Sequence, residues 1–281
     1  MKIDNHLLKG TSTQKVGFKS TSKTSGTFKK GLPDTIIIHF TAGRNTKSSI
    51  QTLTDPTVKA SAHLVIGRDK SITQLVPFNE ITWHAGKSSW DSRNGLNKYS
   101  IGIEIDNAGR LEKQGDEYLS WFGKSYPSTE VFEGRHRNES NSSYWHRYTS
   151  EEIEVTEQIV KLLAKTYNIR HILGHEEISP GRKVDPGPAF PLDKLGNDIL
   201  FSDRETEEDN SFLNKSTPRT SAIVTATKLN VRNNPSKDAK KLRTPLVQGT
   251  EVEILEQQGN WYRVSITEEG WVSKKWLNIN S

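Results

Sequence analysis

Three consecutive isoleucines run directly into a histidine in the segment Thr35–Phe40, and this run constrains the fold more than any other part of the chain. Short β-branched runs of this kind are typical of strands buried inside a sheet. A single histidine in a strand is more often a packed core residue than a ligand. The run therefore predicts a buried strand, and taken alone it leaves the role of His39 open.

Further strand patterns follow this run. Three segments have β-branched or alternating apolar residues and are predicted to be strands: 62–66, 72–76 and 100–105. The stretch 106–149 has few apolar runs and many polar and aromatic residues. We expect it to be a long loop over one face, of the kind that forms a substrate wall in enzymes.

One helix is predicted at residues 150–167, where apolar side chains recur near helical spacing. Thr149 or Ser150 is the expected N-cap of this helix. Glu152 or Ile153 then follows at the distance of a capping box. These signals predict where the helix begins.

The positive charge is concentrated near the two ends of the chain. Residues 1–31 hold seven Lys and one Asp among Ser, Thr and Gly, and we expect a basic flexible N-terminal extension or a loose edge strand. Residues 221–281 carry nine basic and six acidic residues. This distribution suits an anionic polymer, although a solvated tail that aids solubility explains it equally well. Nucleic acid is not the expected partner, because the tail's aromatic residues are limited to Phe18 and Phe28.

Composition excludes several classes of site. The chain has no cysteine, so disulfides, thiolate metal sites and cysteine nucleophiles are ruled out, and any metal must be bound by histidine and carboxylate. No apolar run approaches the roughly 18 residues that span a bilayer, so membrane insertion is not expected.

A change of composition divides the chain. Residues 201–220 include an acidic run and a proline, which is typical of a linker. Beyond it, short alternating strands are separated by turn residues, at 226–231, 251–257, 261–266 and 270–272. This pattern predicts a small β-barrel of about 60 residues.

Three residues form a candidate metal set: His39, His175 and Asp185. Two imidazoles and one carboxylate are a catalytic zinc set, with the fourth position left to water. A metal there would lower the pKa of water and polarise an amide carbonyl. A lone Asp before Pro, however, usually just starts a turn. Spacing alone therefore leaves a metal site and ordinary structural roles both open.

Three segments resemble the N-acetylmuramoyl-L-alanine amidase type 2 family: Ile36–Thr41, Ile101–Glu104 and Gly174–Pro188. The resemblance extends over residues 32–200, and the string Pro180–Gly187 is its most specific part. It implies an α/β (α+β) amidase domain, with a central mixed β-sheet flanked by helices. It also implies one Zn²⁺ per chain, held by His39, His175 and Asp185.

The same resemblance suggests which groups would carry the chemistry. Glu104 shares a strand face with Gly102, opposite the isoleucines, and is the expected general base, although such a residue usually faces solvent. Lys183 lies two residues before Asp185, so in an extended segment both side chains point to the same side. It is expected to stabilise the oxyanion or to protonate the leaving nitrogen, although a surface lysine has the same pattern. His63 and His84 match positions that line the substrate groove in relatives. Trp83 is expected in the same wall, although a core position fits it equally well.

The segment 221–281 is similar to bacterial SH3 domains, through Leu229–Ser236, Gly259–Val264 and Gly270–Leu277. The similarity implies a small all-β SH3-like barrel. Such domains in wall enzymes commonly dock on peptidoglycan, which would make this one a weak tether that raises the local concentration of the enzyme.

Together the resemblances imply zinc-dependent hydrolysis of the amide between N-acetylmuramic acid and L-alanine, with peptidoglycan as the partner and with the C-terminal domain favouring polymeric wall. One alternative is a cytoplasmic recycling amidase that acts on soluble anhydro-muropeptides; another is a noncatalytic peptidoglycan-binding protein. The N-terminal residues lack the apolar core of a secretory signal. We therefore expect cytoplasmic synthesis, with signal-independent export or phage-type lysis as routes to the wall. A phage endolysin, a toxin and a housekeeping hydrolase all fit this pattern, and it favours no oligomeric state.

Overall fold

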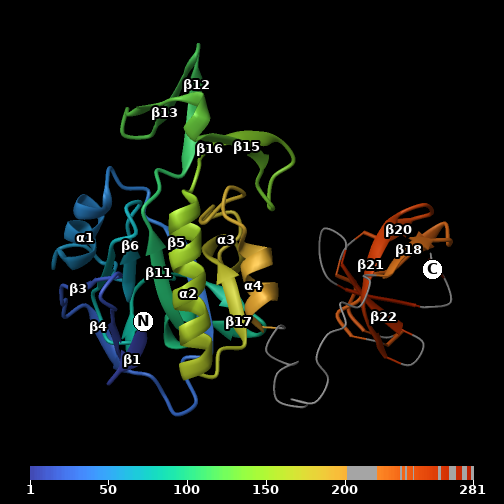
Figure 1. Ribbon diagram of the computed structural model, residues 1–281, viewed down its shortest axis with the longest axis horizontal. Coiled ribbons are helices and arrows are strands. Elements are labelled where there is room, and N and C mark those ends of the chain that lie inside the picture. Colours follow the sequence, from blue (N-terminus) through green and yellow to red (C-terminus); the bar gives the residue numbers. More distant parts are fainter. Residues whose placement is uncertain are drawn as a thin grey trace. The chain divides into compact units, whose positions relative to one another are not determined.

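The computed structural model describes residues 1–200, 220–234, 236–237, 239–242, 244–258, 261–265, 270–273 and 277–279. The chain divides into two compact units, 1–207 and 208–281 (Figure 1). The linker predicted at 201–220 lies outside the described residues, apart from its last position.

A mixed sheet forms the centre of the first unit. Within residues 1–200 it has six strands, in the spatial order β17 (His171–Gly174), β5 (Thr35–Phe40), β11 (Ser100–Ile105), β6 (Leu64–Ile66), β7 (Ile72–Gln74) and β3 (Val16–Phe18). The first four are parallel to one another, β7 is antiparallel to β6, and β3 is parallel to β7. The predicted mixed α/β fold is confirmed, and the predicted bounds of β5 and β11 are those of the structure.

Helices cover both faces of this sheet. Helices α2 (Ser150–Thr166) and α4 (Leu192–Leu200) lie on one face of the sheet (Figure 1). Their apolar side chains pack with Ile36 and Ile38 of β5 in one core. Ile37 points to the opposite face, where it joins a separate cluster with Ile178 from α3 (His175–Ile178). Helix α1 (Thr46–Thr54) packs on this second face beside β6. The isoleucine run is uninterrupted because both faces of β5 are buried.

Helix α2 begins where the sequence signals place it. The Thr149 hydroxyl accepts a hydrogen bond from the Glu152 backbone N–H at 3.1 Å, and the Glu152 carboxylate accepts one from the Thr149 N–H at 2.7 Å. This reciprocal capping box satisfies two of the backbone donors that the first turn leaves unpaired.

The prediction of a long loop at 106–149 was wrong. Five antiparallel strands lie there, in the order β14 (Ser125–Tyr126), β13 (Glu117–Ser120), β12 (Arg110–Gln114), β16 (Ser142–His146) and β15 (Val131–Arg135). This inserted sheet extends beyond the end of the main sheet (Figure 1). Its own core is small, built around Leu111, Tyr126 and Val131. Strand β12 has four polar, exposed side chains in five residues, so the sequence there lacks a strong apolar alternation.

Residues 1–31 are structured rather than a flexible extension. The hairpin of β1 (Lys2–Asp4) and β2 (Leu7–Lys9) contributes Leu8 to the main core, and β3 is the edge strand of the main sheet. Strand β4 (Thr24–Thr27) pairs with β8 (Glu80–Thr82). The alternative of an edge strand agrees with this arrangement. The order comes from long-range contacts, which local composition does not reveal.

Lys23 anchors this N-terminal segment. Its buried ammonium donates to the carbonyl oxygens of Thr52 at 3.4 Å and Asp55 at 2.8 Å at the C-terminal end of α1, and to that of Val58 at 3.1 Å in the following turn. The last carbonyls of a helix lack partners within the helix and carry partial negative charge, so a cation stabilises this end.

The remaining short elements of the first unit are the β9–β10 pair, Ser89–Trp90 and Arg93–Asn94, and the 3₁₀ helices Leu96–Lys98 and Ser128–Glu130. Among the described residues, no helix has both the length and the apolar character needed to cross a bilayer.

The second unit is built of strands alone in its described parts. One sheet has the order β23 (Gly270–Ser273), β22 (Trp261–Ser265), β21 (Glu251–Gln258), β18 (Thr220–Val224) and β24 (Leu277–Ile279), and β19 (Lys228–Leu229) pairs with β20 (Leu246–Val247). Val224, Val231 and Val264 are fully buried in its core. The predicted small all-β domain is confirmed.

Candidate metal centre and cleft

The topology brings three distant residues to one edge of the main sheet. His39 is near the C-terminal end of β5, and His175 is the first residue after β17, the parallel neighbour of β5. Parallel strands place their carboxyl ends at the same edge, which is where α/β proteins build sites. Asp185 comes from the loop after α3, and its backbone carbonyl accepts a hydrogen bond from the Glu176 N–H at 2.9 Å.

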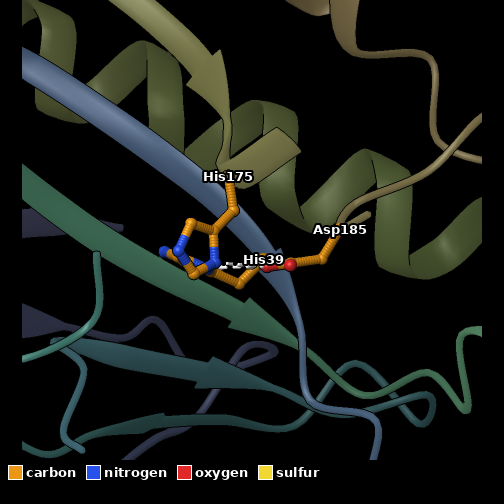
Figure 2. Close-up of side chains that lie close together, drawn as sticks. All are labelled: His39, His175 and Asp185. Atoms are coloured by element: carbon orange, nitrogen blue, oxygen red, sulfur yellow. Dashed lines mark hydrogen bonds and ion pairs between the residues drawn. The ribbon is translucent and has the colours of Figure 1, made fainter. Parts of the chain in front are cut away.

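Three ligand atoms converge at this edge (Figure 2). The Nδ1 atoms of His39 and His175 are 3.0 Å apart, and each lies 2.9 Å from Oδ2 of Asp185. All three side chains are buried. Donor atoms around one tetrahedral zinc, at about 2.0–2.1 Å from it, lie roughly 3.3 Å from one another. The donor set and its spacing therefore fit a zinc ion.

The second nitrogen of the His175 ring supports this assignment. Nε2 lies 3.1 Å from the carbonyl oxygen of Ala85, so Nε2 carries the proton and donates it. The lone pair is then on Nδ1, which faces the other two ligands. A hydrogen bond on the distal nitrogen fixes the tautomer and orientation of metal-binding histidines.

His39 receives the same support from His84. Nε2 of His39 lies 2.9 Å from Nδ1 of His84, and Nε2 of His84 lies 3.3 Å from the carbonyl oxygen of Ser100. Because Ser100 can only accept through that oxygen, His84 donates from Nε2 and accepts on Nδ1. His39 must then donate from Nε2, which leaves its Nδ1 lone pair for a metal.

The charges of these groups are set by burial and by one another. Burial and the neighbouring His175 lower the pKa of His39 to about 4, and burial holds the pKa of His84 well below its usual value. Burial alone would raise the pKa of Asp185, but hydrogen bonds from His175 and His39 outweigh it and keep this pKa below its ordinary range. Two neutral imidazoles and one carboxylate are the protonation states that metal binding requires.

Glu104 lies beside His39, because the two residues are register partners on the parallel strands β11 and β5. Burial and the charge of Asp185 raise the pKa of Glu104 to about 8, although the positive charge of Lys183 acts in the opposite direction. Glu104 is thus a carboxyl group whose proton affinity is close to neutral pH, which suits general base catalysis.

A cleft of about 540 Å³ opens over the triad. It is lined by the predicted ligands, by Glu104, Lys183 and His84, and by residues of α1 and its preceding loop. Within the described part of the chain, the Lys183 ammonium has no hydrogen bond or ion pair. Its donors are therefore available to a group that enters the cleft.

Two predicted groove residues do not line this cleft. His63 is fully buried; it accepts the N–H of Gly102 on Nδ1 at 3.0 Å, and its Nε2 donates to the Glu80 carbonyl at 2.8 Å. The indole N–H of Trp83 donates to the Ser25 hydroxyl at 2.8 Å. The contacts of both residues are those of structural groups.

Glu176 was missed by the sequence analysis. Its buried carboxylate lies 2.7 Å from Nε2 of His136 and accepts the N–H of Gly187 at 3.1 Å. These contacts hold both ends of the segment that carries Asp185. No local signal could have identified the pair, because His136 is 40 residues away, directly after β15 of the inserted sheet.

Comparisons with known proteins identify the families of two regions of the chain. Residues 29–188 match the family model of N-acetylmuramoyl-L-alanine amidase, and residues 227–278 match that of the bacterial SH3 domain. The chain is 30% identical to N-acetylmuramoyl-L-alanine amidase AmiD of Escherichia coli K12 over 223 residues, which cover 76% of this chain and 70% of AmiD.

A second relative is similar over a shorter stretch. The chain is 30% identical to 1,6-anhydro-N-acetylmuramyl-L-alanine amidase AmpD of E. coli K12 over 135 residues, 47% of this chain and 55% of AmpD. Among solved structures, that of E. coli AmiD with the substrate anhydro-N-acetylmuramic acid-L-Ala-D-γ-Glu-L-Lys has a TM-score of 0.44 at 30% identity, over 59% of this chain and 58% of that one. From the matches to the family model and to AmiD, we conclude that the chain is an enzyme that belongs to the N-acetylmuramoyl-L-alanine amidase family.

Proposed function

We propose that the enzyme hydrolyses the amide bond between N-acetylmuramic acid and L-alanine in peptidoglycan, with one zinc ion held by His39, His175 and Asp185. The observation that carries the proposal is the convergence of this donor set with Glu104 and Lys183 in one cleft. A zinc ion bound there would supply a Lewis acid that polarises the amide carbonyl and makes water more acidic.

Glu104 is the general base in this proposal. Its carboxylate accepts a proton from the attacking water and passes it to the nitrogen of L-alanine as the amide bond breaks. The raised pKa supports both steps, because a carboxyl group with proton affinity near the working pH can take up and release a proton in turn.

Lys183 stabilises the negative charge that develops on the carbonyl oxygen. Lys183 lines the cleft, and its ammonium has no hydrogen bond or ion pair among the described residues, so no existing bond must break before it donates to the oxyanion. A donor that is already in position gains the most in the transition state, when the charge is largest.

The wall polymer is the substrate we favour, with the SH3 domain as a tether. A tether raises the effective concentration of an enzyme on an insoluble polymer without any change in the active site. The alternative of a recycling amidase is supported by the relatives named AmpD. A noncatalytic binder is disfavoured, because all three donors and both candidate catalytic groups share the cleft.

The proposal is tested by incubating the purified full chain, with and without a chelator, on intact sacculi and on soluble anhydro-muropeptides. New ends are identified by mass spectrometry. We expect free muramic lactyl carboxylates and free L-alanine amines, lost with chelator and restored by zinc. The absence of these ends on both substrates, with zinc present, would contradict the proposed reaction. Release from muropeptides alone would favour recycling.

A further inference from the structure

An exposed tryptophan stands on the rim of the cleft and has no role in the chemistry above. Trp121 is 76% exposed, the highest value among the large hydrophobic residues of the described chain. It nevertheless lines the same cleft as the zinc ligands and Lys183. A ligand that covers this indole removes apolar surface from water, which favours binding.

The indole is held in place. Its Nε1–H donates to the carbonyl oxygen of Ala42 at 2.8 Å, in the loop that leaves β5 just after His39. Phe122 packs against the small core of the inserted sheet and meets the Trp121 ring edge to face, with ring centres 5.6 Å apart. The guanidinium of Arg44 lies over the Phe122 ring at 5.2 Å.

The turn that carries Trp121 is also closed by hydrogen bonds. It joins β13 to β14, and the Ser120 N–H donates to the Lys124 carbonyl at 2.9 Å. The Lys124 N–H donates to the Ser120 hydroxyl at 3.0 Å. Gly123 has φ +80°, a conformation that favours glycine and lets the chain reverse here. A ring on such a turn is ordered before a ligand arrives, so binding costs little side-chain entropy.

The exposed face of the indole favours contact with an apolar ligand surface that needs no hydrogen bond from the ring. Its N–H is already used, so what remains is a flat apolar face without a hydrogen-bond donor. Such a face suits the C–H groups of a pyranose ring, whose hydroxyls point outward and stay hydrated. A peptide backbone laid on it would leave N–H and C=O groups unpaired, which is unfavourable.

From these contacts we propose that Trp121 is a stacking platform for a sugar ring on the glycan side of the substrate, and therefore a determinant of specificity for sugar-bearing substrates. This inference rests on the proposed function for the identity of the sugar, N-acetylmuramic acid or its neighbour in the strand. The inserted sheet thereby contributes a wall of the cleft as well as support for the ligand segment.

The direct test is ¹⁹F NMR of the zinc-loaded protein labelled with 5-fluorotryptophan. Trp121→Phe assigns the Trp121 resonance by its disappearance. Titration with N-acetylmuramic acid, and with N-acetylmuramoyl-L-Ala-D-isoglutamine on the Glu104→Gln variant, is expected to shift this resonance. The dipeptide L-Ala-D-isoglutamine should leave it unchanged. A shift with the dipeptide alone, or with none of the three, overturns the proposal.

Kinetics on muropeptides give a second measurement. Trp121→Ala is expected to raise KM about tenfold with kcat nearly unchanged, since stacking contributes about a tenfold factor in affinity. Trp121→Phe keeps an aromatic face, so its KM should rise less than that of Trp121→Ala. Phe18→Ala is the matched control, because it removes another exposed aromatic ring, on β3, that does not line the cleft. An unchanged KM in Trp121→Ala would contradict the platform.

The two proposals can fail separately. If sugar binding shifts the Trp121 resonance but the wild-type protein releases no L-alanine ends, the platform stands and the proposed hydrolysis fails. If hydrolysis occurs and the resonance does not respond to sugar, the platform fails alone.

Discussion

Nε2 of His39 lies 2.9 Å from Nδ1 of His84, and this contact decides which nitrogen of His39 is free to bind a metal. The chain of donors runs from His39 through His84 to the Ser100 carbonyl. It makes His84 a positioning residue that acts through His39, and the first prediction follows from it.

His84→Leu should weaken zinc binding about 10- to 100-fold, because the His39 ring loses the acceptor that fixes its tautomer. Zinc affinity is measured by competition with a chelator of known affinity. His84→Asn, whose side-chain oxygen can accept the same hydrogen bond, should recover part of the affinity. Equal affinity in wild type and His84→Leu would show that His39 is oriented without this partner.

Gly102→Ala should also weaken zinc binding, although Gly102 is not one of the proposed ligands. A Cβ at this position would lie 2.4 Å from Cγ of the His84 ring, far inside contact distance. The His84 ring must therefore move, which disrupts its hydrogen bond with Nε2 of His39. Gly17→Ala on the edge strand β3, where a Cβ would make only ordinary contacts at 3.6 Å, is a control for the loss of a glycine in general. Chelator competition reports both; unaltered zinc affinity in Gly102→Ala would count against the coupling.

Glu104→Gln should lower kcat by about two to four orders of magnitude, the usual contribution of general acid–base catalysis, while zinc content stays near one per chain. The amide keeps the shape of the side chain and removes the proton acceptor. Glu112→Gln, on the exposed face of β12, serves as the matched control. Loss of zinc in Glu104→Gln would mean that the carboxylate supports the metal rather than the proton transfer.

Local sequence patterns predicted the elements around this site, and the family resemblance predicted its ligands. The isoleucine run predicted strand β5, which contains His39, and the capping residues predicted where α2 begins. The ligand set came from the resemblance, since two histidines and one aspartate far apart in sequence each have ordinary structural explanations. His84 could be singled out as a site residue, but its contact with His39 spans 45 residues and has no local signature.

The inserted sheet and the N-terminal strands could not be predicted for a different reason. Strand β12 exposes most of its side chains, β13 has only four residues, and the N-terminal strands have three or four residues each. Their stability depends on partners that are distant in sequence, such as the edge of β7 for β3. Trp121 was missed for this reason, because its position on the cleft depends on the β13–β14 turn.

The buried imidazole of His63 should make the protein sensitive to acid. Burial lowers the pKa of His63 to about 4, against an ordinary value of 6.5. The unfolded chain therefore binds a proton between pH 6.5 and 4 that the folded chain does not. Stability is fully present above pH 6.5 and falls toward pH 4, by about 3 kcal/mol for this group.

His63→Gln tests this assignment, because the amide can accept from Gly102 and donate to Glu80 without titrating. Its free energy of unfolding, from urea titrations, should fall less steeply between pH 6.5 and 4 than that of wild type. Acid release of zinc affects both proteins alike and cancels in the comparison. Identical slopes would show that His63 contributes nothing to the acid sensitivity.

Lys23→Met should destabilise the first unit by about 2 kcal/mol, since three carbonyl oxygens at the end of α1 and in the turn after it lose a charged donor. The urea midpoint measures the loss. Lys15→Met, in the same segment but exposed, should change the midpoint little. A similar midpoint for both variants would mean that the helix end is satisfied without Lys23.

The Lys23 contacts also bear on how enzymes of this type can be recombined. The segment shared with the amidase family begins at residue 29, so a chimeric amidase assembled at that boundary would lose the edge strand of the main sheet and the Lys23 ammonium that binds carbonyl oxygens at the end of α1. Helix α1 forms one wall of the cleft, so the exchangeable unit for engineering must include the N-terminal thirty residues.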